Sequence, residues 1–219
     1  MTAGTFHRYV IHFSTGHGAS VPASLTLSSA GHRITRRELL PSRAFDEKDP
    51  NQQQFRLVES QYLRMMRGSA RPLKMVELLI NPMLVDKFNR KQAEFKKKGI
   101  SDEVVLSFHG TTSREAVESI VANNFDVSKL GAHTGNKGAY GAGIYFSDFP
   151  STSMGYGGAT NMLMCRLLPG EVTDVGPCLG APIKGNSHRT GARGADGYGQ
   201  ELVIPTADQI LPCYILHFA

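Results

Sequence analysis

The chain has 219 residues, enough to bury a core of its own as one large domain or as one domain with an appendage. Charged residues make up 20% and hydrophobic residues 41%, and no apolar run approaches the roughly 20 residues of a membrane-spanning helix, so we expect a soluble globular protein with no membrane partner. The three cysteines lack CxxC spacing and the N-terminus lacks a secretion signal, which argues against a disulfide framework or zinc site and predicts an intracellular protein, nuclear or cytoplasmic.

The net charge of +5 has two main sources, the arginines at positions 33, 36 and 37 and the run Lys96-Lys97-Lys98. A lysine run of this kind is typical of a helix C-terminus, where cations interact favourably with the helix dipole. No aromatic residues interleave with these charges, so nucleic-acid binding is the weaker interpretation. A basic surface would also suit a dinucleotide with two phosphates, and the charge alone does not decide between these partners.

Residues 1–50 give the weakest pattern, and we treat them as an N-terminal extension of uncertain fold. Residues 8–13 (RYVIHF) and 24–29 (SLTLSS) predict two short strands, separated by glycine and proline. The histidines at positions 7, 12 and 17 recur every five residues, which matches neither a helix face nor a strand face. We therefore expect them to be surface or loop residues, and no metal site is predicted.

From Asn51 the pattern becomes helical. Apolar residues recur at steps of three and four between Phe55 and Met66, and Gly68 closes the run. Residues 74–80 (KMVELLI) predict a strand, and Asn81-Pro82 is typical of a helix start. The buried side of that second helix is expected to comprise Leu84, Val85, Phe88 and Phe95.

The run VVLSFHGTTS at 104–113 predicts a buried strand that ends at His109 and Gly110. Ser113 is placed to cap the helix REAVESIVANN that follows. The end of the strand therefore offers a polar side chain beside an unhindered backbone amide.

The stretch from 135 to 156 (GNKGAYGAGIYFSDFPSTSMGY) has no helical period and contains five glycines. Glycines at 138, 141 and 143 permit positive φ and lack side-chain bulk, which is what a loop needs where a ligand lies against its amides. A glycine-rich hairpin without a ligand is the alternative. A Rossmann fingerprint does not fit, because these glycines precede a strand, IYFS, rather than a helix. Ser153 and Tyr156 lie three residues apart, so on one helical turn they would point the same way.

The last third of the chain contains several predicted strands. Residues 160–168 (TNMLMCRLL) predict a central strand, and after Pro169-Gly170 the segment EVTDV predicts a short one. Residues 176–200 are glycine-rich without any period, so we expect a mobile loop there. Glu201 opens a further strand, ELVIP, and residues 209–212 lead into the last, CYILHF.

Four motifs occur in order along the chain: HGT at 109–111, GAGIYFSD at 141–148, SxxY at 153–156, and ELVI at 201–204 followed by QILP. In this order they resemble the catalytic domain of the poly(ADP-ribose) polymerase family, the diphtheria-toxin-like ADP-ribosyltransferases. The likeness covers residues 53–219 and includes the helix, strand and Asn-initiated helix before HGT. It implies an α+β fold for residues 51–219, with split, mostly antiparallel sheets and peripheral helices.

The resemblance also implies a set of residues that contact NAD, as substrate and without a metal. Carried over by position, the family's catalytic triad is His109, Tyr145 and Glu201, and its nicotinamide pocket is Gly110, Ser153 and Tyr156.

In that scheme Gly110 and Ser153 would hydrogen-bond the nicotinamide amide, and Tyr145 and Tyr156 would enclose the ring. Glu201 would accept a hydrogen bond from the ribose of the nicotinamide and stabilise the cationic transition state.

His109 would bind the other ribose, that of the adenosine.

The implied activity is transfer of ADP-ribose from NAD to a protein acceptor, with release of nicotinamide. A glutamate at the third triad position permits elongation into poly(ADP-ribose) without requiring it. Three alternatives stay open: a module that binds NAD or ADP-ribose without catalysis, an NAD glycohydrolase that uses water, and a transferase that modifies nucleic-acid ends. The sequence has no long helical segment like the autoinhibitory domain of the DNA-dependent members, which argues against activation by DNA breaks.

Overall fold

A computed structural model describes residues 33–66, 68–111, 113–130, 138–157, 162–190 and 201–219. Their strands form one sheet with the order β1-β2-β9-β5-β3-β4-β8-β7-β6. Neighbouring strands are antiparallel except β6 and β7, which run parallel. The α+β class and the mostly antiparallel sheet expected from the sequence are therefore confirmed.

The elements occur along the chain in this order: β1 (Thr35–Leu39), α1 (Pro50–Met65), β2 (Leu73–Ile80), α2 (Pro82–Lys97), β3 (Val105–Gly110), α3 (Arg114–Asn123), the 3-10 helix η1 (Val127–Lys129), β4 (Ile144–Ser147), α4 (Pro150–Gly157), β5 (Met162–Leu167), β6 (Val172–Val175), β7 (Ser187–Thr190), β8 (Glu201–Ile204), the 3-10 helix η2 (Ala207–Gln209) and β9 (Ile210–Phe218).

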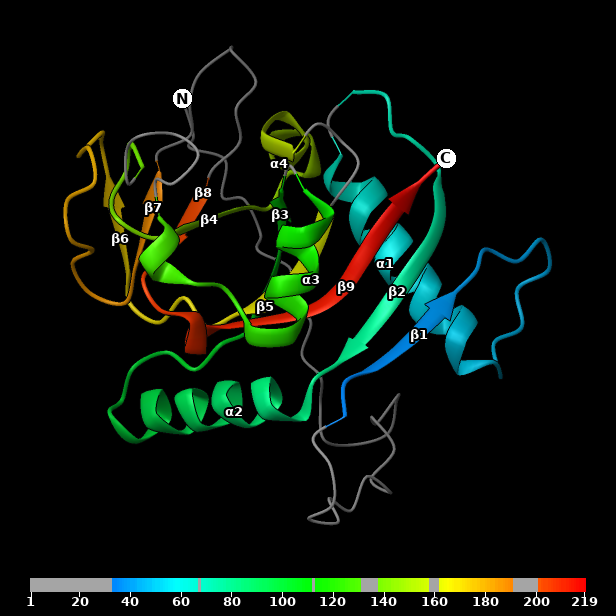
Figure 1. The fold of residues 1–219 in the computed structure, drawn as a ribbon, viewed down its shortest axis with the longest axis horizontal. Coiled ribbons are helices and arrows are strands. Elements are labelled where there is room, and N and C mark those ends of the chain that lie inside the picture. Colours follow the sequence, from blue (N-terminus) through cyan, green and yellow to red (C-terminus); the bar gives the residue numbers. More distant parts are fainter. Residues whose placement is uncertain (1–32, 67, 112, 131–137, 158–161, 191–200) are drawn as a thin grey trace, which may run out of the picture.

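The sheet divides into two halves where β3 meets β4. These two strands pair at one position, Phe108 opposite Ser147. By contrast, β3 pairs with β5 over six positions and β4 with β8 over four. We call β1, β2, β9, β5 and β3 the first half and β4, β8, β7 and β6 the second half. In Figure 1 the first half lies at the centre and right and the second half at the left, so the split expected from the sequence is the β3–β4 seam.

Local sequence explains where the helices begin. Asp49, Asn81 and Ser113 cap α1, α2 and α3 by accepting a hydrogen bond from a backbone N–H of the first turn. Proline occupies the first position of α1 and α2, where its missing N–H costs nothing. The run of lysines at 96–98 ends α2, as expected for cations at a helix C-terminus.

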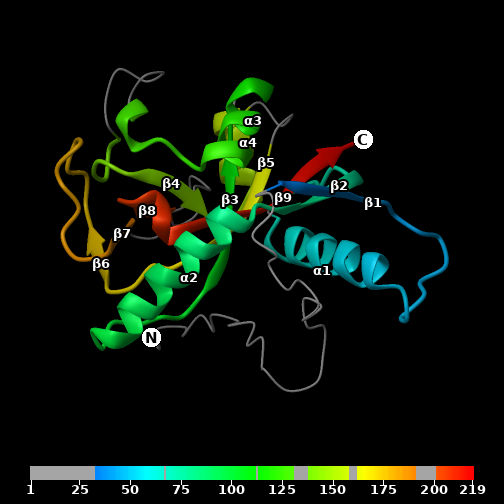
Figure 2. The ribbon, with the colours of Figure 1, turned by 60° about the horizontal axis from the view of Figure 1, so that its bottom comes forward.

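Helices cover both faces of the sheet. Figure 2 shows α3 above the strands and α1 below them. Helix α3 buries Val117, Ile120 and Val121 in the core cluster on its face, and α1 buries Phe55, Val58 and Tyr62 in the cluster on the other. Strand β5 supplies alternate residues to the two clusters, as the two-residue period of a strand requires.

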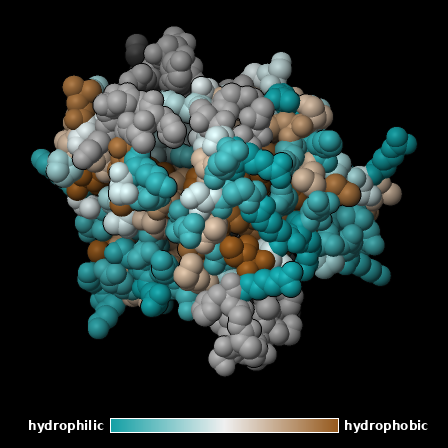
Figure 3. Space-filling model, viewed as in Figure 1, coloured by the Kyte–Doolittle hydropathy of each residue, from teal (hydrophilic) through white to brown (hydrophobic). Residues whose placement is uncertain are grey.

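Helix α2 closes a third apolar cluster through Leu84, Phe88 and Phe95. Figure 3 shows a hydrophilic surface over this helix, so its apolar side faces inward. Among the helices of the described ranges, none is both long and apolar enough to cross a membrane.

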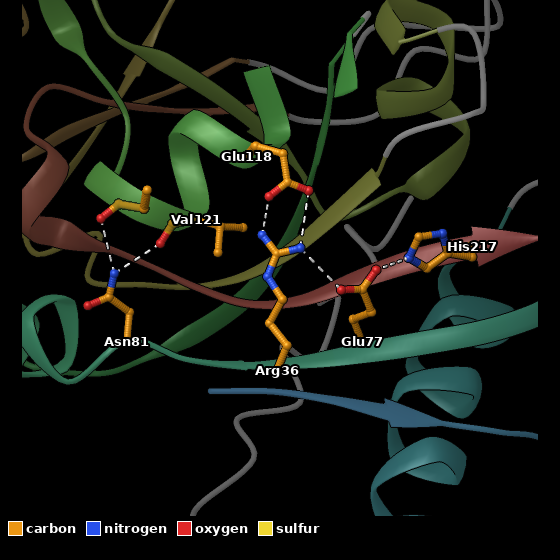
Figure 4. A network of polar contacts seen from close by, with 7 residues as sticks. Arg36, Glu77, Asn81, Glu118, Val121 and His217 are labelled. Atoms are coloured by element: carbon orange, nitrogen blue, oxygen red, sulfur yellow. Dashed lines mark hydrogen bonds and ion pairs between the residues drawn. The ribbon is translucent and has the colours of Figure 1, made fainter. Parts of the chain in front are cut away.

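Strand β1 is an element that the sequence did not predict. It pairs with β2 from Thr35 to Leu39, and Leu39 is fully buried in the cluster around α1. Arg36 of β1 forms ion pairs with Glu77 of β2 and with Glu118 of α3 (Figure 4). Glu77 in turn contacts His217 of β9, with 2.7 Å between its Oε1 and the histidine Nε2. Residues just before the predicted catalytic domain therefore form the outer edge of the sheet.

The prediction of a loop at 176–200 is partly wrong, because residues 187–190 form β7 and pair with strands on both sides. The sequence SHRT contains no apolar residue, yet Ser187, His188 and Thr190 are buried. Side-chain hydrogen bonds satisfy them, as where Ser187 Oγ donates to the Pro169 carbonyl at 2.8 Å. Residues 176–186 contain neither helix nor strand, as predicted. Residues 191–200 lie outside the described residues, as do the strands predicted at 8–13 and 24–29 and the histidines at 7, 12 and 17.

Candidate functional site

The seam brings strands β3, β4 and β8 side by side. Ser147 lies opposite Phe108 on one side and opposite Glu201 on the other. Because residues directly opposite one another and residues two apart share a face, Tyr145 and Glu201 lie on the same face of the sheet. His109, one residue past Phe108, lies on the opposite face, where it contacts Phe125 and Phe146.

His109 spans the seam with its imidazole ring. Its Nδ1 lies 2.9 Å from the carbonyl oxygen of Tyr145. A carbonyl can only accept, so Nδ1 carries the proton and Nε2 is left as an acceptor. Burial lowers the pKa of His109 below the ordinary histidine value, which favours this neutral form. The ring packs against Phe125 at a centroid distance of 4.9 Å.

Gly110 and Ser153 meet at the edge of β3. Ser153 lies in α4, is 4% exposed, and donates its hydroxyl to the carbonyl of Phe108 at 2.9 Å. Backbone groups two residues apart point to the same side of a strand, so those of Gly110 leave β3 on the side that Ser153 occupies. In this arrangement the oxygen of Ser153 offers lone pairs, and it can donate to a ligand only by releasing the Phe108 carbonyl.

Tyr145 is held by its hydroxyl. The oxygen accepts a hydrogen bond from the Tyr140 N–H at 2.8 Å and donates to the Gly141 carbonyl at 2.9 Å. Burial raises the pKa of Tyr145 above its ordinary value, and the nearby negative charge of Glu201 raises it further. Tyr145 is therefore neutral, with its ring fixed in orientation.

The glycines before Tyr145 make room for the protein itself. Gly138 and Gly141 have φ of 107° and 119°, the positive φ expected from the sequence. A Cβ at Gly138 would overlap the Tyr145 phenol, and one at Gly141 would lie 2.9 Å from Nδ1 of His188. A Cβ at Gly143 would meet the side chain of Val203 at 2.8 Å. The space that we assigned to a ligand is thus filled by neighbouring side chains.

Glu201 opens β8 and is 9% exposed. Its backbone N–H donates to the hydroxyl of Thr190 at 2.9 Å. A carboxylate this buried is costly unless other groups or a ligand interact with it. Glu201 and Tyr145 form a diagonal pair on one face of β8 and β4, and the negative charge of Glu201 contributes to the raised pKa of Tyr145.

Tyr156 belongs to the same helix as Ser153, α4, as their spacing predicted. The two differ in exposure, since Tyr156 is 58% exposed and Ser153 is buried. Helix α4 packs against β4, the strand that carries Tyr145, so the two tyrosines belong to neighbouring elements. An exposed ring beside a fixed one leaves an aromatic surface available for a flat ligand.

The six residues singled out in the sequence thus gather around the seam, from β3, β4, α4 and β8. Sequence reasoning missed His188 and Thr190, which touch the same turn and strand, because SHRT carries no strand or motif signal. Within the described residues, no group of three or more His, Cys, Asp or Glu side chains is arranged to hold a metal ion.

Two comparisons with known proteins bear on this site. A search of the curated proteins finds no match. The family model for the poly(ADP-ribose) polymerase catalytic domain matches residues 52–218, which is most of the chain and includes every residue of the site described above. The chain therefore belongs to the poly(ADP-ribose) polymerase catalytic-domain family.

Proposed function

We propose that this protein uses NAD as a substrate and transfers its ADP-ribose to a protein acceptor, with His109, Tyr145 and Glu201 as the catalytic residues. In the balanced reaction the bond between nicotinamide and ribose breaks, a bond from the ribose carbon to the acceptor nucleophile forms, and nicotinamide and the acceptor's proton leave. One observation carries the proposal: the buried Glu201 and the fixed Tyr145 lie on the same face of the paired strands β8 and β4, next to the seam that His109 spans.

The proposed role of Glu201 is electrostatic. As the bond to nicotinamide breaks, positive charge develops on the ribose, and a preorganised carboxylate stabilises that charge better than it stabilises the ground state. Burial strengthens the effect, because little water screens the charge. A carboxylate at this position can also accept a hydrogen bond from a ribose hydroxyl.

The proposed roles of Gly110 and Ser153 are to hold the amide of the nicotinamide. This amide has both a donor and an acceptor, and the backbone N–H and C=O of Gly110 are complementary to the two. The Ser153 oxygen lies at the same strand edge, held by the Phe108 carbonyl. Three polar groups on one edge would fix the rotation of the ring.

Tyr145 and Tyr156 would enclose that ring. The two hydrogen bonds to the Tyr145 hydroxyl set the plane of its ring before a ligand arrives, so little ordering is needed on binding. The exposed Tyr156 offers the second face. His109 would bind the adenosine ribose as an acceptor through Nε2, without transferring a proton.

The test is incubation of the purified chain with labelled NAD, followed by gel separation and a nicotinamide assay. Glu201→Gln keeps the size of the side chain and removes its charge, and we expect a drop in kcat of about 100- to 1,000-fold. Glu201→Ala should be at least as slow. Glu171→Gln is the matched control, because the same change at an exposed glutamate of the second half should leave kcat unchanged.

The acceptor is read from the same gel. A ladder that Glu201→Gln abolishes means chain elongation, and a sharp labelled band means transfer of a single ADP-ribose. Nicotinamide release without any labelled protein would point to a glycohydrolase. A chain that binds NAD but releases no nicotinamide would overturn the proposal and leave a binding module.

A further inference from the structure

Strand β7 carries three buried polar side chains that none of the four sequence motifs includes, and two of them, His188 and Thr190, face the site. His188 and Thr190 lie two residues apart, so they share one face of the strand, and each is 3% exposed. His188 lies opposite Val203 of β8, and Val203 lies opposite Tyr145 of β4. The two β7 side chains are thus on the same face of the sheet as Tyr145 and Glu201.

His188 is fixed by two hydrogen bonds. The Lys184 N–H donates to its Nε2 at 2.9 Å, so Nε2 is unprotonated and the proton is on Nδ1. Nδ1 then donates to the Tyr140 carbonyl at 2.9 Å. Burial lowers the pKa of His188, which keeps this tautomer neutral. The ring therefore acts as a rigid link between the 184–188 turn and the turn at Tyr140.

That second turn holds the hydroxyl of Tyr145. The Tyr140 N–H and the Gly141 carbonyl provide its two hydrogen-bond partners. Nδ1 of His188 donates to the carbonyl of Tyr140, the residue whose N–H donates to the Tyr145 hydroxyl. The His188 ring also fills the space that a side chain at position 141 would occupy. A shift of the His188 ring would move both partners of the Tyr145 hydroxyl together.

Thr190 acts on the other side of the site. The pairing of β7 with β8 runs through His188 and Arg189, and the next step would set Thr190 opposite Glu201. There the Thr190 Oγ1, rather than a backbone carbonyl, accepts the Glu201 N–H at 2.9 Å. The first residue of β8 is thus fixed by a side chain, and with it the direction in which its carboxylate leaves the strand.

We propose that β7 is the positioning strand of this site, in which His188 orients Tyr145 and Thr190 orients Glu201. The inference rests on the proposed function, since it assigns a purpose to the positions of those two residues. Neither β7 residue is a catalytic residue, because each acts through another. Displacement of a reacting group by about 1 Å can cost about 100-fold in rate, so such supports matter.

The test pairs conservative and disruptive variants. His188→Asn keeps an N–H donor near the Nδ1 position, whereas His188→Gln places its amide nearer Nε2 and loses the bond to Tyr140. Thr190→Ser keeps the accepting hydroxyl, whereas Thr190→Val keeps the shape and removes it. We expect His188→Asn and Thr190→Ser to retain most activity. We expect His188→Gln and Thr190→Val to lose about 10- to 100-fold in kcat/KM.

Variants at His188 and at Thr190 should differ in which kinetic constant changes. His188→Gln should mainly raise KM for NAD, because Tyr145 is proposed to contact the ring in the ground state as well. Thr190→Val should mainly lower kcat, because the Glu201 charge matters most in the transition state. Equal activity of Asn and Gln, or of Ser and Val, would overturn the positioning role and mean that β7 only supports folding.

A second measurement does not depend on enzymatic activity. Amide hydrogen exchange followed by NMR on the unliganded chain reports the Tyr140 and Glu201 N–H groups directly. His188→Gln should speed exchange at Tyr140 and Thr190→Val at Glu201, without faster exchange in β9. Unchanged exchange at both amides would overturn the inference. If the wild-type chain were inactive and the two variants still showed these local changes, the proposed function would be rejected and the positioning by β7 supported.

Discussion

The two halves of the sheet are stabilised in different ways. In the first half, β2 has eight residues and β9 nine, and helices press apolar side chains onto both faces. In the second half every strand has four residues. There, side chains bond to backbone groups of neighbouring loops, as where the Asn186 Oδ1 accepts from the Glu171 N–H at 3.0 Å. Apolar burial holds the first half, and β4 and β8 of the second half add Ile144, Phe146, Leu202 and Ile204 to the same core. The outer strands β6 and β7 depend more on individual hydrogen bonds.

The proposed site takes residues from both halves. His109 and Gly110 end the six-residue strand β3 of the first half, whereas Tyr145 and Glu201 lie on four-residue strands of the second. The seam leaves strand edges unpaired beyond Phe108, and there the backbone of Gly110 can face a ligand. Because the first half supplies most of the helix-covered core, we expect substitutions in the second half to change activity more than the free energy of unfolding.

The largest change in stability is expected from Leu39→Ala in β1. Leu39 is fully buried, and truncating such a leucine lowers the free energy of unfolding by about 2–5 kcal/mol. This tests our proposal that β1, which precedes the matched residues 52–218, is part of the catalytic domain. Urea denaturation measures the change.

The neighbouring residue provides the matched control for Leu39. Leu40 is 59% exposed, so Leu40→Ala should change the free energy of unfolding by less than about 0.5 kcal/mol. If Leu39→Ala were as harmless as Leu40→Ala, β1 would be dispensable and the domain would begin at α1.

Gly138→Ala should lower the free energy of unfolding less than Leu39→Ala does, but it should lower the activity more. The φ of 107° at Gly138 disfavours any residue with a Cβ, and the added atom would overlap the Tyr145 phenol. We expect a loss of about 1–3 kcal/mol in unfolding free energy, together with a higher KM for NAD as Tyr145 moves. Gly176→Ala is the control, because nothing lies within 4 Å of a Cβ there. A normal KM in Gly138→Ala would separate the glycine turn from the site.

The same contrast explains how much could be predicted from the sequence. In the first half, the three and four residue steps of Phe55, Val58 and Tyr62 and the cap at Asn81 are local signals, and both predicted helices are present. The nearly continuous apolar run of β5 likewise predicted a central strand. Periodicity works for these elements because burial decides their structure, whereas β1 of the same half, with one buried residue, was not predicted.

In the second half the strands predicted at IYFS, EVTDV and ELVIP are present as β4, β6 and β8, but the contacts that decide β7 are tertiary. Nothing in SHRT indicates a strand, because its buried side chains are polar and their partners, such as the Pro169 and Tyr140 carbonyls, lie far along the chain. The glycines at 138 and 141 were recognised, but what fills the space beside them was not. The candidate site residues came from ordered motifs, which say where a residue falls and not what holds it there.

Lowering the pH should weaken both halves through one histidine each. Burial depresses the pKa of His109 and of His188 below the ordinary histidine value of 6.5, so the folded chain binds fewer protons than the unfolded chain in the window below that pH. The free energy of unfolding should therefore fall as pH drops below 6.5. Denaturation at pH 7.5 and 5.5 measures this.

Single substitutions separate the two contributions to that pH dependence. His188→Asn and His109→Asn should each flatten the slope, since each removes one group whose protonation opposes folding. An unchanged slope in both variants would show that other groups cause the pH dependence.

The smallest effect is expected from the ion pair between Arg36 and Glu118, although it bridges β1 and α3. Their side chains are 34% and 44% exposed, and water and salt screen an exposed pair, so a double-mutant cycle with Arg36→Gln and Glu118→Gln should give a coupling of about 0.2–1 kcal/mol. The coupling should shrink as salt is raised, because the pair lies at the surface. A salt-independent coupling as large as the loss in Leu39→Ala would mean that charge, rather than apolar burial, attaches β1, and the first half would then resemble the second.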